Sequence, residues 1–343
     1  MKILSVFFAA LAAFLLPETA FAASDASEHA VDDLVSHPLA ITCLIVFVLS
    51  YIAVLFEERT HLRKSKPVIL GAGIIWVIIG FIAKDLGVEH HALRSAVFHG
   101  LEEYASLLLF LLAAMTYIGA LQDRNVFGVL RAKLVQAGFN IRQLFWITGI
   151  LAFFLSPIAD NLTTSLVMGA VIMAVGGNDP RFISLGCVNI VCAANAGGAF
   201  SPFGDITTLM VWQAQKAEFF EFFALFLPSV ACFLVPATIM HFFIPDGMPW
   251  AVREKEHIKR GGKLIIFLGL LTIAMAVGFE QLLGLPPFMG MMTGLGLLMV
   301  TAYFIRKFGK DRDENFDILE TVATAEWDTL LFFFGVIFSV GGL

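Results

Sequence analysis

Apolar runs of about 17 to 25 residues recur from residue 38 to the end of this chain, and they restrict what it can fold into. A run of this length is what an α-helix needs to cross about 30 Å of hydrocarbon. Only 15% of the 343 residues are charged, against roughly 25% in an average soluble protein. We therefore expect an all-α polytopic membrane protein. Basic tracts interleaved with aromatic residues do not occur, so nucleic acid is not an expected partner.

The first residues have the pattern of a secretory signal peptide. Lys2 precedes an apolar stretch, and Ala20-Phe21-Ala22 is a typical cleavage site of small residues. We predict a signal peptide over residues 1–23, with an uncleaved membrane anchor as the alternative. In both cases the segment that follows is expected outside the cytoplasm.

The remaining residues, 24–343, form the expected transmembrane transporter region. Its segments are N-terminal spans in 38–121, placed near 38–56, 67–83 and 101–121, and a region of interrupted apolar sequence in 143–216. Further spans in 218–305 are placed near 218–244, 264–282 and 285–305, and a last apolar run follows in 326–343. The loops assigned to the inside carry 18 Lys and Arg residues, whereas the outside connections carry three. The positive-inside rule therefore predicts a multi-pass protein of the bacterial inner membrane with its mature N-terminus outside.

A polar break interrupts the apolar sequence at residues 156–161, within "LSPIADNLTTSLVMG". The apolar pieces on either side, 144–155 and 162–176, would be about 18 and 22 Å long as helices, and neither crosses a bilayer comfortably. Arg142 and Arg181 place both outer ends in inside loops. We expect a re-entrant hairpin with its tip near the bilayer midplane; the alternative is a loop that lies in water. An acid in hydrocarbon costs at least about 2.5–3.5 kcal/mol and indicates function.

A second break follows at residues 195–205, "NAGGAFSPFGD". Its three glycines and one proline make a continuous helix costly there. Irregular backbone at membrane depth is tolerated only where protein covers it or where it lines a water-filled cavity. Two adjacent broken elements with polar residues are typical of the binding site of a secondary transporter.

Two distant segments of the chain are similar to each other. Glu103–Ala120 and Glu326–Leu343 both begin with an acid and an aromatic residue and continue into Leu and Phe. The charge pattern gives them opposite orientations, which predicts an inverted repeat. The counterparts of the two breaks would then follow Leu343. We accordingly expect this chain to be a fragment that stops before the second hairpin and the second broken helix.

The two motifs "SPIADNLTT" and "NAGGAFSPFGDITT" resemble those of the NhaD-type sodium/proton antiporters. The broader resemblance is to the ion transporter superfamily, which includes dicarboxylate and arsenite carriers. In its divalent-anion branch the hairpin tip reads Ser-Asn-Thr, where this chain has Asp160-Asn161. The resemblance covers roughly residues 38–343, with its specific motifs in 156–208. It implies a scaffold with a mobile transport domain, a homodimer and an elevator-type step.

The polar residues of the two breaks suit a sodium ion, which as a hard cation prefers oxygen ligands. Burial favours the neutral form of a carboxyl group and an adjacent cation favours the charged form, so one acid can hold either a proton or a sodium ion. We expect Asp160 and Asp205 to be these carboxylates and to bind Na⁺, with Li⁺ as a second ion. The expected neutral oxygen ligands are Asn161, Thr163, Asn195, Thr207 and Thr208. Ser156 is a further candidate; capping of the following half-helix is its alternative role.

Three residues near the outer face are candidates for proton access or pH sensing: His99, Glu102 and Glu103. For the two acids the alternative is a solvated helix N-terminus, where negative charge suits the helix dipole. We expect no cofactor and no catalytic residues; the expected partners are small inorganic cations and membrane lipid.

Two other functions compete with sodium/proton exchange. A Na⁺-coupled carrier of a dicarboxylate or an arsenite-like anion on the same fold is the first, because half-helix N-termini favour anions. Two acids at the breaks would repel such a substrate. An intramembrane enzyme is a remote second, since neither H-E-x-x-H nor G-x-S-x-G occurs.

Overall fold

The computed structural model describes residues 37–88, 90–177, 179–245, 247, 256–308 and 316–343. Every regular element in these ranges is a helix, which confirms the all-α class. The signal peptide expected over residues 1–23 lies outside the described residues. Six helical segments in the described part are long and apolar enough to cross a membrane: Ser65–Asp85, His90–Asp123, Ile141–Ala159, Phe219–His241, Gly262–Leu283 and Pro287–Lys307.

The chain divides into two compact units, which are described separately. Of the described residues, the first comprises 37–88, 90–99 and 334–343. In it α3 (Ala40–Leu55) packs beside α5 (Ser65–Asp85), and the short α4 (Glu57–Thr60) lies between them in the chain. The end of α16 (Trp327–Gly341) packs on α5, where the indole Nε1 of Trp76 donates to the carbonyl oxygen of Phe338 at 2.9 Å.

The second unit, residues 100–333, contains both polar breaks. It begins within α6 (His90–Asp123) and ends within α16. Its other elements are α7 (Val126–Gln136), α8 (Ile141–Ala159), α9 (Asn161–Gly176), α10 (Pro180–Gly198), α11 (Ile206–Gln213), the 3₁₀ helix η1 (Phe219–Leu225), α12 (Phe226–His241), α13 (Gly262–Leu283), α14 (Pro287–Lys307) and α15 (Ile318–Ala323).

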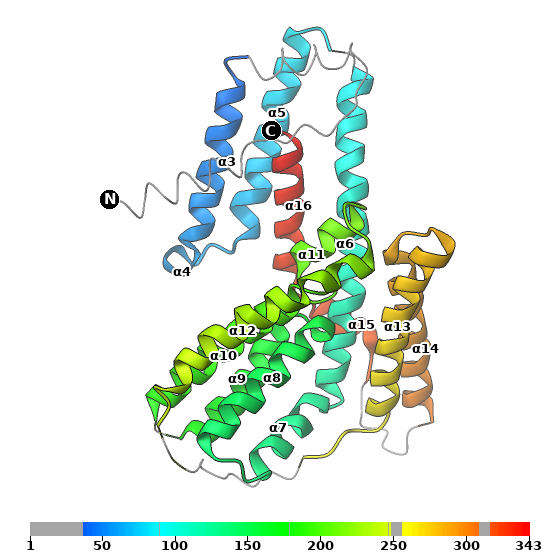
Figure 1. Ribbon diagram of the computed structural model, residues 1–343. Coiled ribbons are helices and arrows are strands. Elements are labelled where there is room, and N and C mark those ends of the chain that lie inside the picture. The colour runs from blue at the N-terminus through cyan, green and yellow to red at the C-terminus, as the bar shows by residue number, and fades with distance from the viewer. Residues whose placement is uncertain (1–36, 89, 178, 246, 248–255, 309–315) are drawn as a thin grey trace. The chain divides into compact units, whose positions relative to one another are not determined.

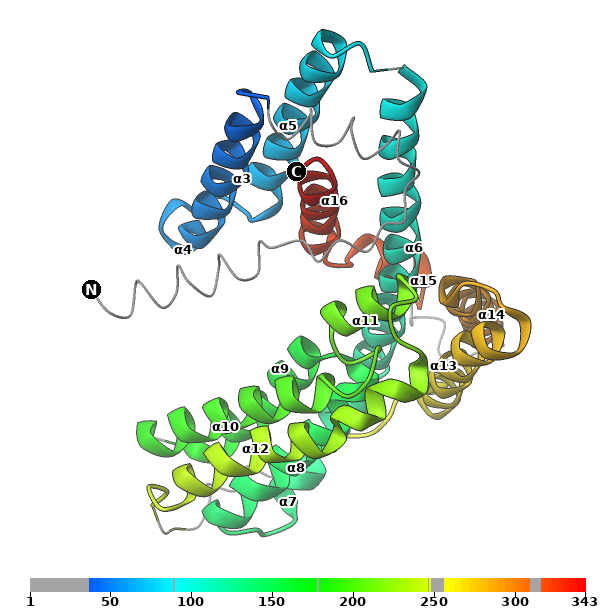
Figure 2. The same cartoon turned by 45° about the horizontal axis from the view of Figure 1, so that its top comes forward.

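Four helices of this unit, α8, α9, α10 and α12, form a bundle that holds the breaks (Figures 1 and 2). Its core is apolar and includes fully buried Phe145, Ile172, Phe182 and Ile190. Helix α7 packs against α9 through its apolar face. Burial of such side chains holds bundle helices at fixed positions, because packed interiors leave few voids.

Helices α13 and α14 form a hairpin within the same unit, and a polar junction joins it to α6. The Tyr117 hydroxyl of α6 donates to the carbonyl oxygen of Gly294 at 2.7 Å and accepts from the Thr272 hydroxyl at 2.9 Å. All three groups are buried, so they satisfy one another where water is absent.

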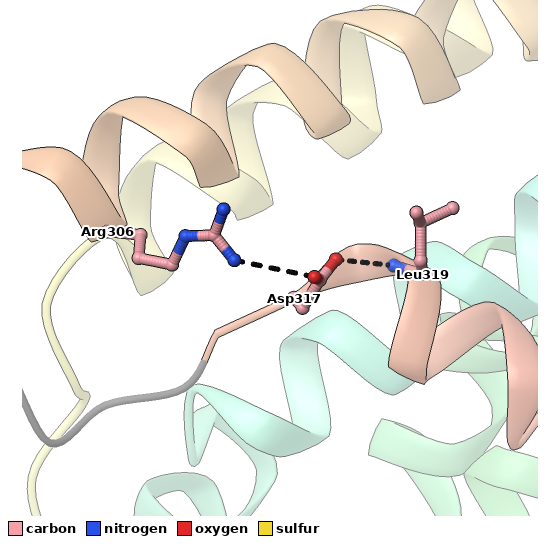
Figure 3. Close-up of polar contacts among 3 residues, drawn as sticks. All are labelled: Arg306, Asp317 and Leu319. Carbon is pink, nitrogen blue, oxygen red and sulfur yellow. Dashed lines mark hydrogen bonds and ion pairs between the residues drawn. The ribbon is translucent and has the colours of Figure 1, made fainter.

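Helix α15 is short and is capped at its first turn. The Asp317 carboxylate accepts from the backbone amide of Leu319 at 2.9 Å and pairs with the Arg306 guanidinium at 3.4 Å (Figure 3). The ion pair is exposed, so we attribute to it mainly an orienting role rather than stability.

Two expectations about helix boundaries are wrong. Helix α6 begins at His90 rather than near residue 101, because neither proline nor glycine occurs between His90 and His99. Glu102 and Glu103 therefore lie well inside the helix, not at a solvated N-terminus. Helix α8 extends from Ile141 to Ala159, about 28 Å at 1.5 Å per residue, so this arm of the hairpin is long enough to cross most of a bilayer.

Candidate functional site

The first break is a single residue, Asp160, between α8 and α9. Its backbone adopts φ 58° and ψ 161°, a combination that residues other than glycine seldom adopt. Its carboxylate accepts from the backbone amide of Thr163 at 2.7 Å and from the Thr163 hydroxyl at 2.9 Å. Asp160 is thus the N-cap of α9, and the alternative that Ser156 caps this helix is wrong.

Helix α8 continues through Pro157, and Gly197 of α10 packs against the carbonyl oxygen that the proline leaves without a helical donor. Proline has no N–H, so the carbonyl oxygen of Phe153 lacks its usual donor. The backbone of Gly197 in α10 lies directly against that oxygen, in a position that no Cβ could occupy. The close approach of the two helices therefore depends on Gly197.

The second break, residues 199–205, separates α10 from α11 and repeats the capping of the first. The Asp205 carboxylate accepts from the backbone amide of Thr207 at 2.8 Å and from its hydroxyl at 2.7 Å. The Thr208 hydroxyl donates to the backbone carbonyls of Ser201 at 2.9 Å and Asp205 at 2.8 Å. Each break thus ends in an aspartate that caps the following half-helix.

The two breaks meet, as the sequence predicted for a shared site. The Asn161 amide donates to Asp205 Oδ2 at 2.8 Å and to Asn195 Oδ1 at 3.2 Å. The backbone amide of Asn161 also donates to the carbonyl oxygen of Gly204 at 3.1 Å. In return, the Ser201 hydroxyl donates to the carbonyl oxygen of Pro157 at 3.1 Å. Backbone groups that each broken helix leaves unpaired are satisfied by the other.

Two buried hydroxyl groups occur four residues before and four residues after Asp160 in the sequence. Ser156 and Thr164 are both fully buried, and neither hydroxyl has a hydrogen-bond partner among the described residues. Other buried threonines in the helices, such as Thr116 and Thr148, donate to a carbonyl one turn earlier in their own helix. Ser156 and Thr164 therefore have oxygen atoms available to a bound species.

The structure brings most of the predicted ligands together around these breaks. Asn161, Asn195 and Asp205 are in direct contact, and Thr163 and Thr207 each bind the aspartate that precedes them. His99, Glu102 and Glu103 lie on α6, and their role in proton access stays a prediction.

The oxygen atoms of the breaks match the preference of a hard cation for carboxylate, amide, hydroxyl and carbonyl ligands. Within the described ranges, no group of three or more His, Cys, Asp or Glu side chains is placed to hold a metal ion. A sodium ion fits this donor set better than a transition metal does.

Sequence reasoning missed Asn189 and the structural role of Ser201. Asn189 is fully buried in α10, and its Nδ2 donates to the carbonyl oxygen of Phe145 at 3.1 Å. A lone amide within the apolar run "CVNIV" was the signal that could have found it.

Residues 38–343 match a family model described as "Citrate transporter". The chain is 50% identical over 333 residues to the Na(+)/H(+) antiporter NhaD of Vibrio cholerae serotype O1, an alignment that covers 91% of this chain and 70% of that protein. The NhaD antiporter of Alkalimonas amylolytica is 48% identical over 360 residues, covering 98% of this chain and 73% of the relative. Sodium/proton antiporter 1 of Arabidopsis thaliana is 32% identical, covering 87% of this chain and 51% of the plant protein.

Proposed function

Because the chain belongs to the NhaD-type sodium/proton antiporter family, we propose that it exchanges Na⁺ for H⁺ across a membrane. The observation that carries the proposal is the meeting of the two breaks, where Asn161 bridges Asp205 and Asn195 beside a second capped carboxylate, Asp160. The relatives are named as antiporters, and exchange of two ions involves no chemical conversion, so the proposed function requires neither catalysis nor a cofactor.

Asp160 and Asp205 are the carboxylates that hold either a sodium ion or a proton. A bound cation favours the charged carboxylate, and desolvation favours the protonated one, so the two ions compete for the same oxygens. The neutral oxygen ligands of this site are Asn161, Thr163, Asn195, Thr207 and Thr208. The Ser156 hydroxyl joins them, since it is buried and lacks a partner among the described residues.

An anion substrate is the competing proposal, and the description of the family model favours it. An anion would bind at the N-termini of α9 and α11, where free backbone amides and the helix dipole attract negative charge. Both N-termini already hold a carboxylate of the chain itself, Asp160 or Asp205. A second carboxylate would be repelled there, so these caps favour a cation as the substrate.

Basic residues at one end of the bundle support the proposed orientation. The start of α8 and the end of α12 meet there, since Arg142 donates to the carbonyl oxygen of Ile244 at 3.4 Å. Arg181 opens α10 at the same end, and Arg131 and Lys133 lie on α7. The positive-inside rule places this end in the cytoplasm, with the mature N-terminus outside a bacterial inner membrane.

The transport step is an elevator-type movement in a homodimer, as the family resemblance implies. The division of the chain into two compact units, with both breaks inside the second, supports a rigid transport domain. Lipid covers the exposed apolar side chains of the outer helices, among them Leu49, Leu70 and Phe267.

Everted membrane vesicles with a pH-sensitive dye test the function. After acidification of the lumen, Na⁺ should release protons, and Li⁺ should do so as a second ion, whereas choline and citrate should not. Uptake of labelled citrate without Na⁺-dependent proton release would instead identify an anion carrier. Vesicles from cells that lack the protein provide the baseline.

A further inference from the structure

Helices α8 and α10 run side by side in the same direction, and four contacts between α8 with its hairpin tip and α10 with the break that follows it join residues 44 apart in the sequence. The Asn189 amide donates to Phe145, the Ser201 hydroxyl to Pro157 and the Asn161 amide to Asp205, and each pair is 44 residues apart. Gly197 lies against the carbonyl oxygen of Phe153, again at an offset of 44. We call this constant offset the register of α10 against α8. It is kept from Phe145, near the start of α8, to Asn161 and Asp205, where the two breaks meet.

This register decides whether the site forms. A slip by one residue would displace α10 by about 1.5 Å along α8. The Asn161–Asp205 hydrogen bond is 2.8 Å long, and such bonds tolerate only a few tenths of an ångström. A slip of one residue would therefore separate these two side chains.

The contact between Asn189 and Phe145 is the one in this series that lies farthest from the site. Asn189 lies nine residues before the end of α10 at Gly198, about 14 Å at 1.5 Å per residue. It is fully buried, and only its donor half is used, since Oδ1 has no partner among the described residues. In hydrocarbon or a dry protein interior a lost partner for this amide is not replaced by water.

The Asn189 amide packs against α8 at Gly149, where the absence of a side chain leaves room for it. A Cβ on Gly149 would lie 2.5 Å from Asn189 Nδ2 and 3.1 Å from the ring of Phe233. The amide therefore fits into a gap that glycine leaves, with Phe233 of α12 closing its side. Small residues that let helices approach and polar side chains that join them are the usual means of helix association in membranes.

We propose that Asn189 is a positioning residue, which sets the register of α10 against α8 and so holds Asn161 opposite Asp205. This inference rests on the proposed sodium/proton exchange for its transport readout, and it has a second readout that does not depend on transport. Asn189 acts through the two broken elements and does not itself touch the ion.

Kinetics of two variants in everted vesicles test the proposal. Asn189→Leu removes the amide with little change in size, and Asn189→Ala removes both the donor and the acceptor of the side chain. Both should raise the Na⁺ concentration for half-maximal exchange by about three- to tenfold, the range that one interhelical hydrogen bond supports. A residue with a merely structural role would lower the amount of folded protein and leave this concentration unchanged.

Thr148→Val is the matched control. Thr148 is also fully buried and donates to the same Phe145 carbonyl at 3.2 Å, but both of its hydrogen bonds stay within α8. This variant should keep the wild-type Na⁺ dependence. An equal shift in Thr148→Val, or no shift in either Asn189 variant, would overturn the proposal.

Hydrogen exchange of the purified full chain supplies the second readout. The Asn161 amide, which donates to Gly204, should exchange at least about fivefold faster in Asn189→Leu than in the wild type or Thr148→Val, because a slipped register opens this bond. Unchanged protection of this amide would refute the register proposal. If the wild type moves no protons with Na⁺, the proposed function fails, and hydrogen exchange alone decides the register.

Discussion

Asp160 and Asp205 each cap a helix, and the proposed function requires each carboxylate also to bind an exchangeable ion. A protonated carboxyl group keeps a carbonyl oxygen, which still accepts from the backbone amide of Thr163 or Thr207. The first turn of each half-helix therefore stays capped in the proton-loaded state and in the sodium-loaded state. The proposed exchange of ions at these residues therefore requires no unwinding of the half-helices that they cap.

This double role makes Asp160→Asn an informative variant. Asparagine is as good an N-cap as aspartate, so the hairpin should fold. The lost negative charge removes about 4 kcal/mol of attraction for a cation at 4 Å, for an effective dielectric constant of 20, which is about a thousandfold in affinity. We expect no Na⁺-dependent proton release in everted vesicles at wild-type levels of expression.

Asp179→Asn is the control for this variant. Asp179 caps α10 in the same way, by accepting from the backbone amides of Arg181 at 3.0 Å and Phe182 at 3.1 Å, but it lies at the opposite end of that helix from the breaks. It should retain exchange. Wild-type exchange in Asp160→Asn would remove this carboxylate from the proposed ion site.

At the scale of elements, the last turns of α8 in the hairpin pack against α10 and the break that follows it. Pro157 leaves the Phe153 carbonyl without a helical donor, and the end of α8 leaves the Pro157 carbonyl unpaired. Gly197 packs on the first of these oxygens, and the Ser201 hydroxyl donates to the second. Two carbonyl groups of the last turns of α8 thus lie against groups from α10 and from the break that follows it.

Gly197→Ala should disturb this arrangement. Its Cβ would meet the backbone of Phe153, which cannot move as a flexible side chain could. Overpacking of this kind costs about 1–3 kcal/mol, so we expect a lower thermal unfolding temperature of the detergent-solubilised protein and reduced exchange.

The matched control is Gly169→Ala in α9. A Cβ on Gly169 would have no atom within 4 Å, and alanine is favoured over glycine inside a helix by about 0.5–1 kcal/mol. This variant should be as stable as the wild type or more so. Equal losses of stability in both variants would contradict the specific role assigned to the Gly197–Phe153 contact.

At the scale of the whole molecule, the orientation of the bundle decides from which side the ions reach the site. The loop after α7 and the start of α10 should both face the cytoplasm, whereas Lys216 should face outside. In a variant without native cysteines, Ala137→Cys and Arg181→Cys should react with a membrane-impermeant maleimide in everted vesicles only. Lys216→Cys should react in intact spheroplasts; the reverse pattern would invert the topology. All three positions are exposed.

The positions of the helices and of both breaks were predictable, because they depend on local sequence. The expected spans 38–56, 67–83 and 264–282 agree closely with α3, α5 and α13. Hydrocarbon forces each spanning segment to satisfy its own backbone, so length and apolarity suffice to identify it. The extent of α8 was not predictable, since Pro157 argued for an earlier end and the packing of Gly197 and Ser201 against its last turns is a tertiary contact.

The candidate site residues stand out in the sequence by their chemistry, whereas the contacts between them were not predictable. The acids, amides and hydroxyls of residues 156–208 stand out against an apolar background. Which oxygen meets which donor depends on the packing of segments that are 44 residues apart. Asn189 was overlooked for the same reason, since its importance lies in the partner that packing gives it.

The sequence by itself determined that this chain is an all-α membrane protein with two polar breaks and a strong charge asymmetry between its two faces. Those properties follow from single segments and their solvent. Only the tertiary structure decided that Asp160 and Asp205 cap their half-helices, that Asn161 bridges the breaks and that one register joins α8 to α10. These contacts arise because buried backbone groups must find partners, and the partners lie on another helix.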